Sequence, residues 1–455
     1  MLAMLHTTEF ALLRRVAAEQ AESRAPSLVA AVTRGSETLW TGARGQVDGA
    51  APTADTQYRI GSITKTFIAV LVLRLRDEGR LDLNDSLDKH LAGTSFGHLT
   101  IAQLLAHTGG VTSESPGVWW ERAPGGDWPA LVDNLDEDVV KLRAGERFHY
   151  SNLGYGVLGQ LVAELRGMSW LDALNAEILA PLGMTRTTPM PATPHALGWA
   201  VHPYADVLLP EPTPDAGAMA PAGQLWSTTT DMARWLGFIA GGASPVLHPD
   251  TVEEMRAPAT VEDGAAWTSG YGLGFQVWRD SNRRLVGHTG SMPGFVATVV
   301  VDEVTTTGAL AMANSTAGVA VSTMSMELLK LVDDYEPALP AEWRPLTEVD
   351  ADLLSLTGQW FWGPTPFVLR LMAGGWVDLR PAARAGRGSR FRPTGTGEWV
   401  GLDGYYAGET LRLHHHADGA VSHFDLATFI FTRTPYDPKA PIPGGLDGRG
   451  WRPGE

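Results

Sequence analysis

Runs of hydrophobic and polar residues divide the chain into regions with different periods. Within the first 335 residues, alternating apolar runs predict β-strands and 3.6-residue spacings predict helices. The strand patterns lie at residues 28–32, 38–42 and 270–313, and the helical patterns lie at 8–22, 63–240 and about 316–334. Strands followed by helices and then by strands are typical of an α+β fold, in which the N- and C-terminal helices pack on one sheet.

A second region follows a cluster of prolines, which predicts a linker over residues 336–352 after a first domain at 1–335. Six or more short alternating runs then follow, separated by glycine-rich turns. They predict a small antiparallel β-barrel over residues 353–437. Residues 438–455 are rich in proline and glycine and lack a period, so we expect a tail there.

Composition excludes several kinds of function. The net charge is −16 and no basic run is present, which argues against a nucleic-acid partner. The chain has no cysteine and no H-E-x-x-H motif, so we expect no metal and no cofactor. No segment has the roughly twenty apolar residues of a membrane span, and the N-terminus lacks the features of a signal peptide. We therefore expect a cytoplasmic protein with no membrane partner.

Ser62 and Lys65 lie three residues apart at the start of a predicted helix, where they share one face. Only five of the 35 basic residues are lysines. Arginine cannot release its proton, whereas a buried lysine can shift towards neutrality and accept one. A lysine beside a serine hydroxyl is therefore the arrangement that an activated nucleophile needs.

The chain also holds a second S-x-x-K sequence, from Ser86 to Lys89. Acidic residues surround it, and we predict a solvated loop or a helix cap there. The tetrapeptide alone is therefore a weak indication of catalysis, and the assignment depends on its context.

Tyr150 and Asn152 provide that context for Ser62. They stand just before a second predicted helix, which begins at Leu153. Beside Lys65, the phenolate of Tyr150 would be stabilised, and the pair could take the proton of Ser62 and pass it to a leaving group. A half-buried packing tyrosine is the alternative interpretation for Tyr150 taken alone.

A third sequence, His288-Thr289-Gly290-Ser291, precedes a strand pattern rich in β-branched residues. It predicts a strand edge whose glycine allows a ligand to approach closely. The order S-x-x-K, Y-S-N, H-T-G resembles the serine β-lactamase and penicillin-binding protein superfamily, and most closely its class C branch. Weaker resemblances lie at residues 104–110, 223–228, 231–233 and 271–275.

The resemblance implies a β-lactamase/transpeptidase-like domain, with an antiparallel sheet flanked by helices and a helical subdomain. It also implies roles for the matching residues. Ser62 would be the acylated nucleophile, Lys65 its partner, Tyr150 the general base and acid, and Asn152 the residue that orients the substrate amide and Lys65. The backbone amides of Ser62 and Ser291 would form the oxyanion hole, and Thr289, Gly290 and Ser291 would bind the substrate along the strand edge.

The chain departs from this pattern at His288, where β-lactamases and transpeptidases have lysine. Imidazole is largely neutral near pH 7, so it is a poor anchor for a substrate carboxylate. We expect it to hydrogen-bond Tyr150 instead. D-aminopeptidase-like and esterase-like relatives and the penicillin-binding-protein-type thioesterases are similar to this chain in carrying a histidine here.

Three interpretations of function follow from the resemblance. The first is a serine hydrolase that acts on esters or on amides of D-residues, with a small-molecule or peptide substrate. The second is a thioesterase or acyl transferase that cyclises or transfers a peptidyl group. The third is a β-lactamase or a penicillin-binding sensor that barely turns over. The predicted barrel resembles the lipocalin-like C-terminal domains of some class C relatives, and the oligomeric state is left open by the sequence.

Overall fold

The structure is a computed structural model that describes residues 4–337 and 342–435, apart from positions 243, 263, 265, 282, 317, 384, 385 and 396. The chain separates into two compact units, residues 1–339 and 340–455. Part of the expected linker at 336–352 and the expected tail at 438–455 lie outside the described residues.

The first unit is built on an eight-stranded antiparallel sheet with the strand order β2-β1-β12-β11-β10-β9-β8-β7. The strands are β1 (Ser27–Arg34), β2 (Glu37–Gly45), β7 (Thr260–Val261), β8 (Ser269–Tyr271), β9 (Gln276–Asp280), β10 (Arg283–Met292), β11 (Phe295–Asp302) and β12 (Thr307–Ala313). The predicted N-terminal hairpin is confirmed, since β1 pairs with β2. β1 also pairs with β12, so the N-terminal hairpin and the C-terminal strands form one sheet.

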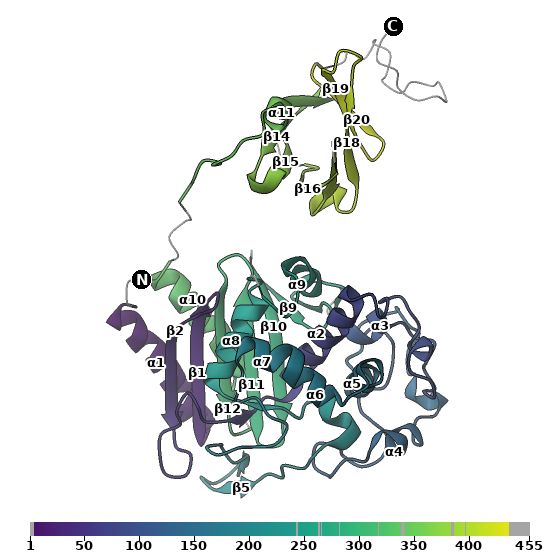
Figure 1. Ribbon diagram of the computed structural model, residues 1–455. Coiled ribbons are helices and arrows are strands. Elements are labelled where there is room, and N and C mark those ends of the chain that lie inside the picture. Colours follow the sequence, from purple (N-terminus) through teal and green to yellow (C-terminus); the bar gives the residue numbers. More distant parts are fainter. Residues whose placement is uncertain are drawn as a thin grey trace. The chain divides into compact units, whose positions relative to one another are not determined.

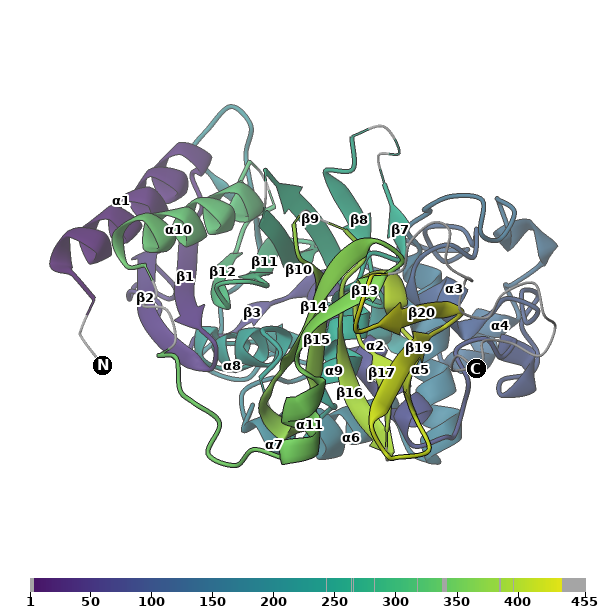
Figure 2. The ribbon, with the colours of Figure 1, turned by 90° about the horizontal axis from the view of Figure 1, so that it is seen from above.

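Helices cover both faces of this sheet (Figures 1 and 2). α1 (His6–Ser23) and α10 (Val321–Tyr335) share one hydrophobic cluster with β1 and β12, as the pattern predicted. The opposite face packs against α2 (Thr64–Asp77) and α8 (Thr229–Ile239). No helix within the described residues combines the length and the apolar character needed to cross a membrane.

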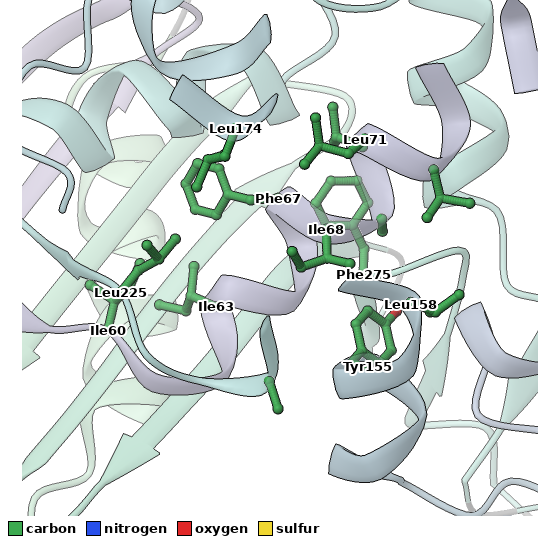
Figure 3. Packing of buried hydrophobic residues seen from close by; sticks show 14 of the residues in the cluster. Ile60, Ile63, Phe67, Ile68, Leu71, Tyr155, Leu158, Leu174, Leu225 and Phe275 are labelled. Carbon is green, nitrogen blue, oxygen red and sulfur yellow. The ribbon is translucent and has the colours of Figure 1, made fainter. Parts of the chain in front are cut away.

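The helical subdomain packs on α2, which is buried over most of its surface. α2 is apolar on nearly all sides because it lies between the sheet and the subdomain. Figure 3 shows Phe67, Ile68 and Leu71 of α2 near Leu158 and Leu174 of the subdomain. The subdomain contains α3 (Ile101–Leu105), α4 (Trp128–Val132), α5 (Asn152–Arg166), α6 (Trp170–Leu174) and α7 (Ala180–Leu182), and α9 (Pro249–Arg256) precedes β7.

Short elements connect these layers. They are the two-stranded pairs β3 (Tyr58–Arg59) with β6 (Trp226–Ser227) and β4 (Trp199–Val201) with β5 (Leu208–Pro210), and the 3₁₀ turns η1 (Gly61–Ile63), η2 (Leu87–Lys89) and η5 (Gly217–Ala222). The pairing of β3 with β6 matters for the site, because it brings the chain before Ser62 beside the segment after η5.

The second unit is a closed antiparallel barrel of eight strands, so the predicted small barrel is confirmed. Its strands are β13 (Gly358–Trp362), β14 (Thr365–Leu371), β15 (Val377–Pro381), β16 (Ser389–Gly395), β17 (Glu398–Gly401), β18 (Thr410–His415), β19 (Val421–Leu426) and β20 (Phe429–Thr432), preceded by α11 (Ala351–Leu356). Large buried side chains, among them Trp360, Phe391 and Phe424, fill its interior. The barrel is therefore only loosely lipocalin-like.

Candidate active site

Ser62 stands in η1, at the point where β3 leads into α2. Gly61 has a φ of +55°, which turns the chain against β10. Lys65 lies one turn further on, and its Nζ is 2.9 Å from the Ser62 Oγ. The same amine donates a hydrogen bond of 2.6 Å to the carbonyl oxygen of Ala222. The predicted contact between the serine and the lysine is therefore present.

Lys65 has no exposed surface. Burial lowers the pKa of its amine to about 7, and the nearby carboxylates of Glu114 and Glu121 oppose that shift. About half of an amine with this pKa is unprotonated at pH 7 and can accept a proton, which an arginine could not do.

Tyr150 lies two residues before the start of α5, and its hydroxyl hydrogen-bonds the Ser62 side chain. The Lys65 Nζ lies 5.0 Å from the centre of the Tyr150 ring. Burial nevertheless raises the pKa of Tyr150 above its usual value, and the hydrogen bond with Ser62 offsets only part of that rise. The expected stabilisation of the phenolate is therefore wrong for this state, because desolvation is the largest effect and the carboxylates of Glu114, Glu121 and Glu262 raise the pKa of Tyr150 further.

His288 is buried on β10, and its Nδ1 contacts the carbonyl oxygen of Thr289. Because a carbonyl only accepts, Nδ1 carries the proton and Nε2 accepts from the Tyr271 hydroxyl at 2.9 Å. Burial, followed by the charge of Lys65, lowers the pKa of His288 to about 3. The imidazole is neutral, as predicted.

The predicted hydrogen bond between His288 and Tyr150 is wrong. Their ring centres are 6.3 Å apart, and Nε2 is engaged by Tyr271, which β8 carries into the same buried layer. Residues 271–275 show a weak resemblance to the superfamily, but their sequence does not indicate that Tyr271 contacts His288.

Gly290 and Ser291 lie against the turn that carries Ser62. A Cβ built at Gly290 would stand 1.9 Å from the Ile60 carbonyl oxygen and 3.2 Å from the Ser62 nitrogen. A Cβ built at Gly61 would stand 2.5 Å from the Ser291 nitrogen. Two glycines are thus needed for the close approach that brings the backbone amides of Ser62 and Ser291 together. Thr289, one residue earlier, also lines the cleft.

Asn152 begins α5 and bonds to a residue that the sequence analysis missed. Its Nδ2 donates to the two carboxylate oxygens of Glu114 at 2.8 and 3.0 Å, and the Trp120 indole donates to the same carboxylate at 2.8 Å. The expected orientation of Lys65 by Asn152 is not what the structure has, since Lys65 bonds to Ser62 and Ala222 instead. The buried Oδ1 of Asn152 has no hydrogen-bond partner within the described part of the chain.

His107 is a further residue that was not assigned to the site. Its ring centre lies 4.3 Å from that of Tyr150, and its Nδ1 accepts from the Ser151 amide at 3.0 Å. His107 therefore packs against the Tyr150 ring and holds the backbone of the next residue, Ser151. The segment 104–110 was noticed only as a family resemblance, while Glu114 and the Ala222 carbonyl lie in stretches without any periodic pattern.

The second S-x-x-K sequence is a solvated turn, as predicted. Ser86 hydrogen-bonds Asp88 at 2.6 Å, and the exposed Lys89 pairs with Asp85 at 2.6 Å. Neither side chain is arranged to activate the other.

A cleft of about 630 Å³ opens over Ser62. Tyr150, Gln276, Thr289 and Ser291 line it, together with the start of α10. Its charged side chain is a carboxylate, Glu262. Nowhere among the residues that the structure describes do three His, Asp or Glu side chains come close enough to hold a metal ion.

Comparison with known proteins matches both units. Residues 12–332 match the family model described as Beta-lactamase, and residues 349–433 match a domain of unknown function (DUF7586). A human beta-lactamase-like protein is 27% identical over 293 residues, which cover 60% of this chain and 58% of the human one. The chain therefore spans little more than half the length of this curated relative.

Solved structures are also similar. A D-stereospecific amidohydrolase from Streptomyces is 25% identical, with a TM-score of 0.60 over 70% of this chain and 97% of that one. The octameric penicillin-binding protein homologue from Pyrococcus abyssi is 22% identical, with a TM-score of 0.63, and covers 93% of this chain and 99% of its own. The second likeness concerns the fold alone and extends over both units.

Proposed function

Because the chain belongs to the beta-lactamase family, we propose that it is a serine hydrolase that forms an acyl-enzyme at Ser62. Lys65, with a pKa of about 7, takes the proton of Ser62 as the hydroxyl oxygen attacks the substrate carbonyl carbon. The backbone amides of Ser62 and Ser291 stabilise the oxyanion that forms.

Tyr150 then acts as the general acid. Its phenol, kept protonated by burial, donates to the leaving amine or alcohol as the bond to the acyl carbon breaks, and the Lys65 ammonium returns a proton to the phenolate. Water attacks the acyl-enzyme with the same residues in reverse order, which restores Ser62 and releases the acid.

The charges around the cleft support a substrate with a free amino group. Glu114 and Glu121 act on Lys65 and Tyr150, Glu262 lines the cleft, and His288 is a neutral group at the position where the family's β-lactamases have a lysine. A negative cleft attracts cations and disfavours a carboxylate. We therefore propose amides and esters of amino acids as substrates, rather than β-lactams.

The contact between Asn152 and Glu114 is the observation that carries this proposal. The Glu114 carboxylate lies in the loop before α4 and accepts from the Asn152 Nδ2 at the start of α5, while the buried Oδ1 of Asn152 has no partner within the described residues. An ammonium group donates three hydrogen bonds, and it would pair with the exposed Glu114 carboxylate. The similarity to a D-stereospecific amidohydrolase supports D-residues as the acyl donor.

Glu114→Gln tests the proposal. The measurement is kcat/KM for D-phenylalanine p-nitroanilide with a free amine and for its N-acetyl form. We expect wild type to prefer the free amine and Glu114→Gln to lower that preference about tenfold, since a hydrogen bond to a charged group contributes about 1.5–3 kcal/mol. Glu253→Gln, an exposed carboxylate on α9, is the matched control. An equal rate on both substrates in wild type would contradict the proposal.

A further inference from the structure

The edge of β10 that faces the cleft is only partly paired. β9 pairs with β10 as far as the contact between Gln276 and Gly287, so residues 288–292 have no neighbouring strand on that side within the part of the chain that the structure describes. The Gln276 side chain continues the ladder by one step, because its Oε1 accepts the backbone N–H of Thr289 at 2.8 Å. A side chain thus fills the place of a strand residue.

The next open position on this edge is Ser291. Residues two apart present their backbone groups to the same edge of a strand, so Thr289 and Ser291 both face the cleft. The nitrogen and carbonyl oxygen of Ser291 lie next to Gly61, beside the nucleophile. A substrate that is acylated at Ser62 therefore pairs with β10 at Ser291.

The leaving group extends towards Thr289. Tyr150 is the proton donor in the proposed reaction, and its ring lies 6.3 Å from that of His288, which precedes Thr289 on β10. The leaving atom has to reach the Tyr150 hydroxyl, so the chain beyond it runs along the Thr289 part of the edge. In a leaving group of two amino-acid residues, the second residue would need the backbone N–H of Thr289, which already donates to Gln276.

We infer that Gln276 caps β10 and limits the leaving group to a small one, such as ammonia, a simple alcohol or one amino acid amide. This inference rests on the proposed function. Glu262 lines the cleft with Gln276, and its carboxylate disfavours a leaving group that ends in a free carboxylate. The site is therefore that of an amidase or esterase with short leaving groups, rather than that of a carboxypeptidase or an endopeptidase.

A panel of three substrates with one acyl donor tests this inference. They are the primary amide, the glycinamide and the glycylglycinamide of the amino acid that wild type hydrolyses fastest, compared by kcat/KM. We expect wild type to prefer the primary amide. In Gln276→Ala the relative rate on the glycylglycinamide should rise about fivefold to tenfold, because the freed Thr289 N–H gains a hydrogen bond from substrate.

Gln276→Glu keeps an oxygen acceptor of the same length and should keep the wild-type ratio. Gln276→Asn, which is too short to reach Thr289, should behave as Gln276→Ala does, and it serves if the alanine variant does not fold. A purely structural role would lower thermal stability without changing the ratio. An unchanged ratio in both shortened variants, or equal rates on the three substrates in wild type, would overturn this inference but leave the proposed function standing. The absence of any covalent adduct with every acyl donor, followed by intact mass, would overturn the proposed function and this inference with it.

Discussion

Gly61 lies directly against Ser291, so that a Cβ built on Gly61 would stand 2.5 Å from the Ser291 nitrogen and 2.8 Å from its carbonyl oxygen. The two residues are 230 positions apart in the chain, and their contact joins the turn that carries Ser62 to the open edge of β10. The geometry of the proposed oxyanion hole depends on this contact.

Gly61→Ala should therefore reduce kcat strongly. The new methyl group has to push β10 away, which moves the Ser291 amide out of reach of the oxyanion, and the loss of one such donor costs about a hundredfold or more in rate. The measurement is kcat on a chromogenic ester, with circular dichroism to show that the fold is retained.

Gly79→Ala is the matched control for that variant. Gly79 also has a positive φ, +71°, but no atom of the described residues lies within 4 Å of a Cβ built there. It should lose about 1 kcal/mol of stability and keep near-normal kcat. If Gly61→Ala were as active as Gly79→Ala, the close approach to Ser291 would not matter for catalysis.

Lys65 sets the pH dependence of acylation. Its pKa is about 7 in the folded protein, so the amine is protonated below that pH and neutral above it. The acylation rate of an uncharged ester should rise with pH through about 7 and then level off. This rise of the rate with pH should be absent in Lys65→Arg. Lys65→Arg should also lose as much rate as Lys65→Ala, because arginine cannot accept a proton. Near-normal acylation in Lys65→Arg would show that only a positive charge is required.

His288→Lys should shift the enzyme towards anionic substrates. The buried imidazole is neutral, and a lysine would place on β10, next to Thr289, an amine that a substrate carboxylate stabilises in its charged form. We expect slower acylation by uncharged esters and faster acylation by benzylpenicillin, with the ratio of the two second-order rate constants changing about tenfold, as one charge interaction of about 1.4 kcal/mol would give. An unchanged ratio, or a wild type that already favours penicillin, would restore a β-lactamase assignment.

The parts of the site that the sequence predicted depend on short-range periodicity. Ser62 and Lys65 share a helix face, and the strand edge at Thr289 to Ser291 follows from alternation along one strand. The neutral state of His288 was also predictable, because imidazole has a low intrinsic pKa.

The contacts that were missed come from residues distant in sequence. Tyr271 reaches His288 from the end of β8, and Glu114 reaches Asn152 from a loop, so only the tertiary fold brings each pair together. The raised pKa of Tyr150 has the same origin, since the burial that causes it depends on packing against His107 and its neighbours. In the barrel, alternation predicted the strands, but not that aromatic side chains such as Trp360 would fill the interior.

Covalent labelling tests the central claim, acylation of Ser62, most directly. Wild type, Ser62→Ala and Ser86→Ala would each be treated with a fluorophosphonate, and the intact masses and labelled peptides measured. We predict one adduct on the Ser62 peptide in wild type and in Ser86→Ala, and none in Ser62→Ala. Ser86 should not react in wild type, because its hydroxyl donates to Asp88. An adduct in folded Ser62→Ala, or its loss in Ser86→Ala, would contradict the account.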